Sequence, residues 1–286
     1  MLKFECNLVT IYIPTYNRLE LLKRSIASVL NQTYSNIELI VVDDCSTDGT
    51  QDYLKEISSQ DSRVKYFLKE KNSGACVSRN IAIRNAQGYF ITGLDDDDFF
   101  DIDRIEKLII AWGKKNEGTI ALSTLYKIKN KNKTIYGKKL FKNKLIKFDD
   151  LFLNNVVGNQ IFTKTEILKN IDGFDENLKC WQDLECWLRV LNIGNIEKIF
   201  LHSYTIDVSH DRPRIGNSNH TKYLKSYEYI SKKHALNGRN NEYLYIQTYN
   251  CNGVDLDKVT ILKVLKKYPS FELFLMVLKA YIKGVK

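Results

Sequence analysis

The sequence predicts an α/β fold in which a mainly parallel central sheet is flanked by helices. Four short apolar runs, at residues 8–13, 37–42, 64–68 and 89–94, alternate with segments whose apolar residues recur at helical spacing. This alternation is typical of parallel strands joined by crossover helices. Polar clusters follow three of the runs directly, and such sheets bind ligands beyond the carboxyl ends of their strands. The sequence therefore predicts a ligand site at that edge.

The predicted helices are recognised by apolar faces. The first helix carries an apolar face of Leu22, Ile26, Val29 and Leu30. Another helix is expected to open at residues 72–74 and to run to about residue 86. The lysine-rich stretch at 114–147 predicts a surface hairpin region. A later helix follows a turn at 172–175 and carries Leu184, Trp187, Leu188 and Leu191 on one face.

Residues 216–286 are predicted to form a helical C-terminal accessory region, with Pro269 between two helical pieces. Within 258–286, lysines alternate with aliphatic and aromatic residues in a basic amphipathic pattern. That pattern fits the surface of a membrane that carries anionic lipid. Packing against the chain's own core, or against a dimer partner, is an equally good interpretation.

The composition is that of an ordinary globular protein, with 44% hydrophobic and 27% charged residues in 286. The net charge of +9 favours an anionic partner, such as nucleic acid, nucleotide phosphate, phospholipid or a diphosphate-linked substrate, without choosing among them. Six cysteines without a C-x-x-C pair indicate reduced thiols rather than a zinc site. Because the sequence has no apolar signal region and no run of 18 apolar residues, we expect a cytoplasmic protein, either free or peripheral at the inner face of the plasma membrane.

Four consecutive aspartates at 95–98 follow the fourth predicted strand. Neighbouring carboxylates repel one another, which raises some of their pKa values unless a cation lies among them. Mg²⁺ or Mn²⁺ accepts one or two carboxylates and completes its shell with water and substrate phosphates. On an extended segment Asp95 and Asp97 would point one way, and Asp96 and Asp98 the other. A solvated acidic turn is the alternative, but a buried strand that delivers the aspartates to the ligand edge favours a metal site.

Other polar residues at the predicted edge suit a nucleotide. Asp44 follows the second strand, and its carboxylate can accept the N–H of a uracil ring. Tyr16 follows the first strand and can stack on the base. Gly74 and Arg79 flank the start of a helix, where N–H groups and a guanidinium favour phosphate. Turn formation and helix capping are the alternatives, and physical chemistry alone does not decide between them.

Taken together, these segments resemble the family 2 glycosyltransferases of the GT-A fold. The matching pieces are, in order, PTYNR at 14–18, VDDCSTDGT at 42–50, NSG at 72–74 with SRN at 78–80, LDDDD at 94–98, GFDENL at 173–178 and QDLECWLR at 182–189. Any one of these motifs is common, whereas six in this order over residues 1–210 are highly specific. The resemblance implies a GT-A (Rossmann-like) domain at 1–215, with a donor half at about 1–100 and an acceptor half at about 101–215.

The resemblance also implies roles for individual positions. Asp183 matches the family's general base, although Gln182 replaces the glutamate that often precedes it. Asp97, together with Asp95, is implied to bind Mn²⁺ or Mg²⁺, and His210 is implied to make a further contact with metal or phosphate. The extra aspartates leave the register of the metal-binding motif ambiguous by one residue. Nucleotide-sugar binding is implied for Pro14, Thr15, Tyr16, Asn17, Asp44, Gly74, Arg79, Asp95 and Asp96. Closure over the diphosphate is implied for Arg212 and Arg214.

We therefore expect an inverting, metal-dependent glycosyltransferase that moves a hexose or N-acetylhexosamine from a UDP-sugar to a glycan acceptor. The family context implies a polyprenyl-diphosphate-linked acceptor in O-antigen or capsule synthesis. A metal-dependent nucleotidyltransferase is the first alternative, but no Gly-rich triphosphate loop follows the first strand. A basic nucleic-acid-binding protein is the second alternative. The lysines at 114–147 lack an interleaved aromatic platform, so we expect no nucleic-acid partner.

Overall fold

The computed structural model describes residues 7–137, 144–210, 220–250, 258–271 and 273–275. The chain divides into two compact units. The sheet unit comprises Met1–Phe148, Val157–Glu176 and Gln182–Asp211, and the C-terminal unit comprises Asp149–Val156, Asn177–Trp181 and Arg212–Lys286. No pattern in the sequence indicated that the two short earlier segments belong to the C-terminal unit. The domain boundary near residue 215 and the division into donor and acceptor halves remain predictions.

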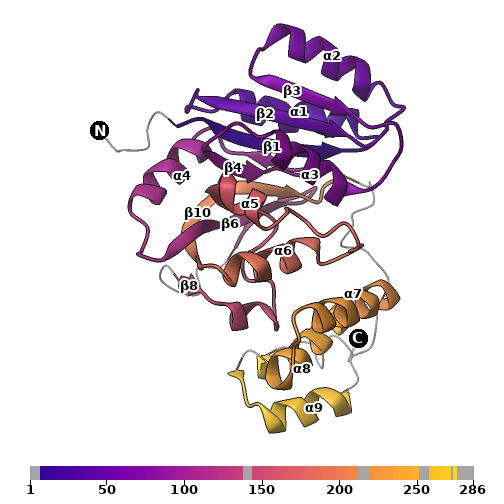
Figure 1. Cartoon of the computed structure of the whole chain (residues 1–286), viewed down its shortest axis with the longest axis vertical. Coiled ribbons are helices and arrows are strands. Elements are labelled where there is room, and N and C mark those ends of the chain that lie inside the picture. The colour runs from indigo at the N-terminus through magenta and orange to yellow at the C-terminus, as the bar shows by residue number, and fades with distance from the viewer. Residues whose placement is uncertain (1–6, 138–143, 211–219, 251–257, 272, 276–286) are drawn as a thin grey trace. The chain divides into compact units, whose positions relative to one another are not determined.

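The sheet unit is built on a ten-stranded sheet with the order β3-β2-β1-β4-β9-β6-β10-β5, in which β7 pairs with β6 and β8 with β10 (Figure 1). The strands are β1 Val9–Thr15, β2 Ile37–Asp43, β3 Val64–Leu68, β4 Phe90–Gly93, β5 Phe99–Phe100, β6 Thr119–Lys129, β7 Thr134–Tyr136, β8 Lys144–Ile146, β9 Phe162–Lys164 and β10 Asn195–Asp207. The four strands expected in the first 100 residues are therefore all confirmed.

Strand direction explains why distant segments meet at one edge. β3, β2, β1 and β4 run parallel to one another. β9 is antiparallel to both β4 and β6, and β10 runs parallel to β6. Two antiparallel steps restore the original direction, so the carboxyl end of β10 lies at the same edge as those of β1, β2 and β4. The mainly parallel central sheet is thus confirmed.

Helices cover both faces of this sheet. They are α1 Leu19–Leu30, α2 Thr50–Gln60, α3 Ala75–Asn85, α4 Arg104–Gly113, α5 Thr165–Asn170 and α6 Gln182–Leu191. Buried residues of α1, α2 and α4 pack with alternate residues of β1 and β2 in a single apolar cluster. α3 contacts β1 and β2 but contributes nothing to that cluster, which places it on the opposite face. Burial of the predicted apolar stripes on α1 and α6 provides the driving force for docking these helices.

The expectation of a surface hairpin at 114–147 is only partly correct. β6 and β7 do form an antiparallel hairpin, and the described residues of its tip are exposed. The first half of β6, however, lies in the interior of the sheet between β9 and β10, and Ala121 and Leu122 are fully buried. The lysines of β6, Lys127 and Lys129, lie in its outer half, so the composition of the whole stretch was a poor guide to the position of this strand.

From residue 220 onward, the described part of the C-terminal unit is largely helical, as expected. Its elements are α7 His220–Lys233, α8 Gly238–Gln247, α9 Lys258–Lys267 and the 3₁₀ turns η1 Phe148–Leu151, which begins in the sheet unit, and η3 Thr248–Asn250. Pro269 separates α9 from helical residues at 271 and 273–275, and residues 276–286 lie outside the described part. Within the described residues, no helix has the length and apolar character needed to span a membrane.

Candidate active site

The four aspartates at 95–98 form a tight turn, here called the aspartate turn. β4 ends at Gly93, and the N–H of Asp98 donates to the carbonyl of Asp95 at 3.0 Å. The expectation that alternate aspartates point the same way was therefore wrong, because the segment is not extended. A Cβ at Gly93 would lie 2.1 Å from Oε1 of Gln160, which shows how closely the strand end is packed.

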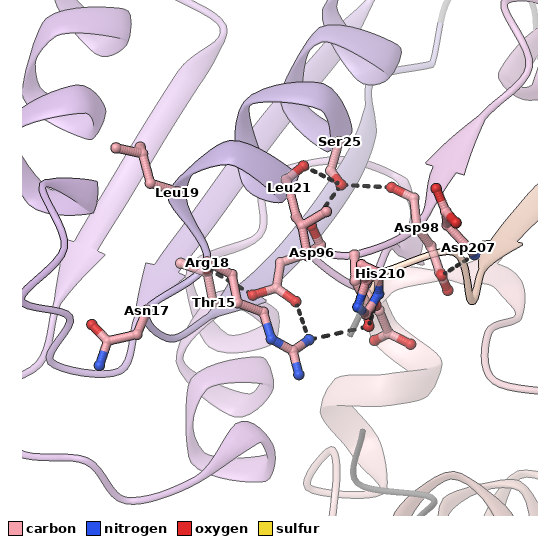
Figure 2. A network of polar contacts seen from close by, with 12 residues as sticks. Thr15, Asn17, Arg18, Leu19, Leu21, Ser25, Asp96, Asp98, Asp207 and His210 are labelled. Carbon is pink, nitrogen blue, oxygen red and sulfur yellow. Dashed lines mark hydrogen bonds and ion pairs between the residues drawn. The ribbon is translucent and has the colours of Figure 1, made fainter. Parts of the chain in front are cut away.

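Asp96 and Asp97, which are sequence neighbours, share one arginine. Nη1 of Arg18 lies 2.9 Å from Oδ1 of Asp96 (Figure 2). The same nitrogen lies 3.1 Å from Oδ2 of Asp97. The Thr15 hydroxyl donates to the other oxygen of Asp96 at 2.8 Å. Burial raises the pKa of Asp96 to about 6 although Arg18 lowers it, and the charge of Asp97 adds to the rise. The repulsion expected between adjacent carboxylates is thus present, and Arg18 only partly relieves it.

His210 lies against the same carboxylates, on the segment that follows β10. Its Nε2 atom is 3.4 Å from Oδ2 of Asp97. Figure 2 shows the imidazole near the Arg18 guanidinium and the aspartate turn. The structure therefore brings together Asp97 and His210, which lie 113 positions apart in the sequence. Arg212 and Arg214, which were expected to close over the diphosphate, lie outside the described residues.

Asp95 has a different set of partners. Its Oδ1 accepts a hydrogen bond from Nη2 of Arg79 at 3.1 Å, and the amides of Asn159 and Gln160 lie 3.4 Å from its oxygens. The other terminal nitrogen of Arg79 donates to Oε1 of Gln182 at 3.0 Å. Burial lowers the pKa of Arg79, but the nearby Asp95 carboxylate outweighs this and the pKa is raised, so the guanidinium is charged. Arg79 thereby connects the aspartate turn to the first residue of α6.

Asp183 is the next residue of α6 and lies in its first turn, where the helix dipole favours a carboxylate. Its side chain is half-buried. Burial raises the pKa of Asp183, while the N–H of Leu184 and the charge of Arg79 oppose the rise. A carboxylate with a raised pKa and partial exposure is suited to accepting a proton.

Asp98 has a structural role in the turn. Its Oδ2 accepts a hydrogen bond from the hydroxyl of Tyr204 at 2.9 Å, and its Oδ1 accepts one from the N–H of Asp207 at 3.0 Å. The Tyr204 hydroxyl also accepts a bond from the N–H of Asp95 at 3.3 Å. Asp98 is fully buried, and both of its oxygens are bonded to β10. The register in which Asp98 would be a metal ligand is therefore disfavoured.

Asp44 is held by the start of α3. Its Oδ1 accepts hydrogen bonds from Nζ of Lys69 at 2.5 Å and from the N–H of Ser73 at 2.8 Å, and its Oδ2 accepts one from the N–H of Gly74 at 2.8 Å. Gly74 has a φ of +94°, a conformation that favours glycine. Asp44 thus uses the N–H groups that were expected to face a phosphate. Contacts of Asp44 and Gly74 with the nucleotide remain predictions.

The loop after β1 is tied to the loop after β2. The N–H of Asn17 donates to the hydroxyl of Ser46 at 2.8 Å, and Oδ1 of Asn17 accepts a hydrogen bond from the N–H of Thr47 at 2.8 Å. Tyr16 is 45% exposed, whereas Pro14 is buried in β1. The N–H of Asp44 donates to the carbonyl of Thr15, the residue before Tyr16, at 2.8 Å. Stacking of the exposed Tyr16 ring on a base remains a prediction.

The donor chemistry of the site fits a hard divalent cation that arrives with substrate. Among the residues that the structure describes, no three His, Cys, Asp or Glu side chains converge to hold a metal by themselves. Asp97 and His210 supply one carboxylate and one imidazole at short range. Mg²⁺ is commonly held by one or two carboxylates together with substrate phosphates, so two protein ligands are sufficient. Asp95, which is bound to Arg79, remains a predicted ligand.

Several residues at the site were not singled out from the sequence. Arg18 was noted only as part of a motif, although a basic residue so close to a strand end is a readable signal. Tyr204 and Asp207 gave no such signal. Their contacts exist because β10 joins the sheet beyond an intervening antiparallel strand, which local spacing does not encode.

Comparison with known proteins now gives the family. The family model described as "Glycosyl transferase family 2" matches residues 10–171, more than half of the chain. The chain is 33% identical over 234 residues to the putative colanic acid biosynthesis glycosyl transferase WcaA of Escherichia coli strain K12, covering 79% of this chain and 81% of WcaA. The chain therefore belongs to glycosyltransferase family 2, as its motifs indicated, and the similarity to WcaA points to bacterial surface polysaccharide biosynthesis.

The chain is also similar to a second glycosyltransferase in sequence and to a solved structure in fold. The chain is 36% identical over 192 residues to an Escherichia coli enzyme, UDP-Glc:alpha-D-GlcNAc-diphosphoundecaprenol beta-1,3-glucosyltransferase WfgD, covering 67% of this chain and 73% of WfgD. The structure of S. aureus TarS residues 1–349 in complex with UDP-GlcNAc superposes with a TM-score of 0.72 at 17% identity, covering 91% of this chain and 81% of TarS. The likeness to TarS establishes the GT-A fold.

The anchoring role of Asp98 predicts a contrast between neighbouring aspartates. Asp98→Asn should lower the free energy of unfolding by about 2 kcal/mol, because an amide nitrogen would face one of two buried donors. Asp97→Asn should leave the stability unchanged or raise it, since it relieves repulsion from Asp96. Urea denaturation followed by circular dichroism measures both changes. Equal destabilisation by the two substitutions would contradict the anchoring role.

Proposed function

We propose that this glycosyltransferase inverts the anomeric centre while moving a hexose or N-acetylhexosamine from a UDP-sugar to a glycan acceptor. The proposed acceptor is a sugar on a polyprenyl diphosphate, used in O-antigen or capsule synthesis. The name of WfgD, which specifies a UDP-Glc donor and a diphosphoundecaprenol-linked acceptor, supports this substrate pair. The UDP-GlcNAc complex of TarS supports a uridine nucleotide.

The observation that carries the proposal is the bridge made by Arg79. One end of its guanidinium bonds Asp95 at 3.1 Å, and the other bonds Gln182 at 3.0 Å. Asp183 follows Gln182 directly and lies within electrostatic range of both Arg79 and Asp95. A carboxylate suited to proton transfer is thus held beside the turn that would bind the donor, as an inverting displacement requires.

In the proposed reaction Asp183 accepts the proton of the acceptor hydroxyl while that oxygen attacks C1 of the donor sugar. The bond between C1 and the diphosphate oxygen breaks, and the electron pair leaves with UDP. Asp44 and Tyr16 would orient the uracil, and Thr15 and Asp96 would lie toward the ribose. Bound Mn²⁺ or Mg²⁺, held by Asp97 with His210, would neutralise charge on the leaving diphosphate.

Family membership favours this function over the nucleotidyltransferase alternative. Both classes use a divalent cation and a nucleotide, but they release different products. The nucleic-acid-binding alternative is disfavoured because the functional edge carries four aspartates, which would repel a phosphate backbone in the absence of metal.

Replacement of Asp183 tests the catalytic assignment. Asp183→Asn keeps the shape of the side chain but removes its basicity, so kcat should fall by at least 100-fold while the affinity for UDP changes little. Sugar transfer is measured by UDP release, and UDP affinity by isothermal titration calorimetry. Turnover near the wild-type value would exclude Asp183 as the base.

The same residue sets the expected pH dependence. The base must be ionised, and burial raises the pKa of Asp183 above its usual value. Activity of the wild-type enzyme should therefore rise with pH through that raised pKa. The acid limb of the kcat/KM profile should lie above the ordinary aspartate range near pH 4. An acid limb at or below pH 4 would contradict the assignment.

The metal assignment predicts that Asp97 links UDP binding to the cation. In the wild-type protein Mn²⁺ should strengthen UDP binding, and Asp97→Ala should abolish this gain because the carboxylate ligand is lost. Calorimetric titration of UDP with and without Mn²⁺ measures both affinities. A variant that keeps the full Mn²⁺-dependent gain would remove Asp97 from the ligand set.

We also propose that the C-terminal unit touches the cytoplasmic face of the plasma membrane. Val264 and Leu273 are buried within the unit, so part of the amphipathic pattern serves its own core. Leu262, Phe271 and Phe274 are instead exposed, Phe271 by 74%. Exposed lysines at 263, 266 and 267 accompany them, a combination that suits an anionic lipid surface.

Liposome co-sedimentation tests this contact. A triple substitution of Leu262, Phe271 and Phe274 by serine should reduce binding to vesicles that contain phosphatidylglycerol at least several-fold, because the inserting apolar groups are lost. The matched control replaces three exposed apolar residues of the sheet unit, Tyr89, Ile102 and Ile193, and should bind as the wild type does. Equal binding by both variants would refute the membrane contact.

A further inference from the structure

Side chains of α1 hold the aspartate turn by its backbone carbonyl oxygens. The hydroxyl of Ser25 lies 2.9 Å from the carbonyl oxygen of Asp96 and 2.5 Å from that of Asp98. Nη2 of the preceding residue, Arg24, donates to the carbonyl of Asp97 at 2.5 Å. Three successive carbonyls thus face one turn of α1. Figure 2 shows Ser25 beside Asp96 and Asp98. Because a hydroxyl has a single proton, Ser25 donates a hydrogen bond to one carbonyl at a time, whereas Arg24 donates independently to the carbonyl of Asp97.

The other end of the Arg24 guanidinium reaches the segment that carries His210. Nη1 lies 2.5 Å from Oδ2 of Asp207, the last residue of β10. The second oxygen of Asp207 accepts hydrogen bonds from the N–H and the hydroxyl of Ser209, at 2.8 and 2.5 Å. His210 follows directly. The orientation of this short segment therefore depends on the Asp207 carboxylate that Arg24 binds.

The surroundings make this a fixed contact between charged groups. Burial raises the pKa of Asp207, but the bonds from Ser209 and Arg24 outweigh it and lower the pKa, so the carboxylate is ionised. Nζ of Lys129 also lies 3.8 Å from Oδ2 of Asp207. The guanidinium of Arg24 also lies over the ring of Phe99, 4.8 Å from its centroid, which restricts its orientation.

We propose that Arg24 is a positioning residue that sets the separation of Asp97 and His210 and thereby determines how tightly the site binds a divalent cation. It holds the Asp97 backbone with one nitrogen and, through Asp207, the His210 segment with another. The inference rests on the proposed metal site. Without Arg24 the turn keeps its bonds to Ser25 and Tyr204, so the fold should persist while the spacing of the two ligands loosens.

The test measures Mn²⁺ affinity rather than activity. Arg24→Met keeps much of the apolar stem over Phe99 and removes both polar bonds. Free Mn²⁺ is quantified by electron paramagnetic resonance during titration of the full chain in the presence of saturating UDP. We expect the dissociation constant to rise 10- to 100-fold, the range typical of losing an outer-shell partner. Arg24→Lys, which can keep one bond, should recover part of the affinity.

Arg63 provides a matched control elsewhere on the sheet unit. Like Arg24, it bonds a carboxylate and a backbone carbonyl. Its Nη2 atom donates to the carboxylate of Asp61 at 2.7 Å and to the carbonyl of Leu30 at 3.1 Å. Its side chain is 31% exposed, compared with 34% for Arg24. Arg63→Met should lower thermal stability to a similar extent but leave Mn²⁺ affinity unchanged. A general loosening of the fold would instead weaken Mn²⁺ binding in both variants.

Asp207→Asn supplies a second variant should Arg24→Met fail to fold. It leaves an oxygen for Ser209 and removes the charge that Arg24 binds, so it should also weaken Mn²⁺ binding. Wild-type affinity in a folded Arg24→Met or Asp207→Asn protein would overturn the positioning role while leaving the metal site intact. Absence of Mn²⁺ binding by the wild-type protein would overturn the metal site itself, and this inference with it.

Discussion

The mutual repulsion of four neighbouring carboxylates, three of them buried, is the constraint on which the site depends. The four carboxylates are compensated by partners from three different parts of the chain. Arg18 serves Asp96 and Asp97, Arg79 serves Asp95, and β10 holds Asp98 through Tyr204. Buried charges without such partners would neutralise by shifting their pKa values or destabilise the fold. The edge of the sheet is therefore organised around this turn.

These compensating contacts also place the other functional groups. Arg79 extends from the turn to the start of α6, which carries Asp183. Arg24 extends from the turn to the end of β10, beyond which His210 lies beside Asp97. The same salt bridges and hydrogen bonds that stabilise the turn would therefore set the distances on which the proposed donor binding and proton transfer depend.

The sequence predicted the architecture well because strong, local signals encode it. Apolar runs gave the four parallel strands, and strand ends gave the edge at which Thr15, Asp44 and the aspartate turn gather. What could not be predicted depends on contacts over long separations. The turn conformation of residues 95–98, the interior position of β6 and the bonds from Tyr204 to Asp98 all require knowing which distant strands are neighbours.

Product analysis of the purified protein tests the central claim most directly. The protein is incubated with Mn²⁺, a panel of α-linked UDP-sugars and a synthetic diphosphate-lipid acceptor. The products are then identified by mass spectrometry and the anomeric proton signal in NMR. The proposed function predicts release of UDP and a β-linked product, because a single displacement inverts the anomeric centre. Release of inorganic diphosphate, or an α-linked product, would contradict it.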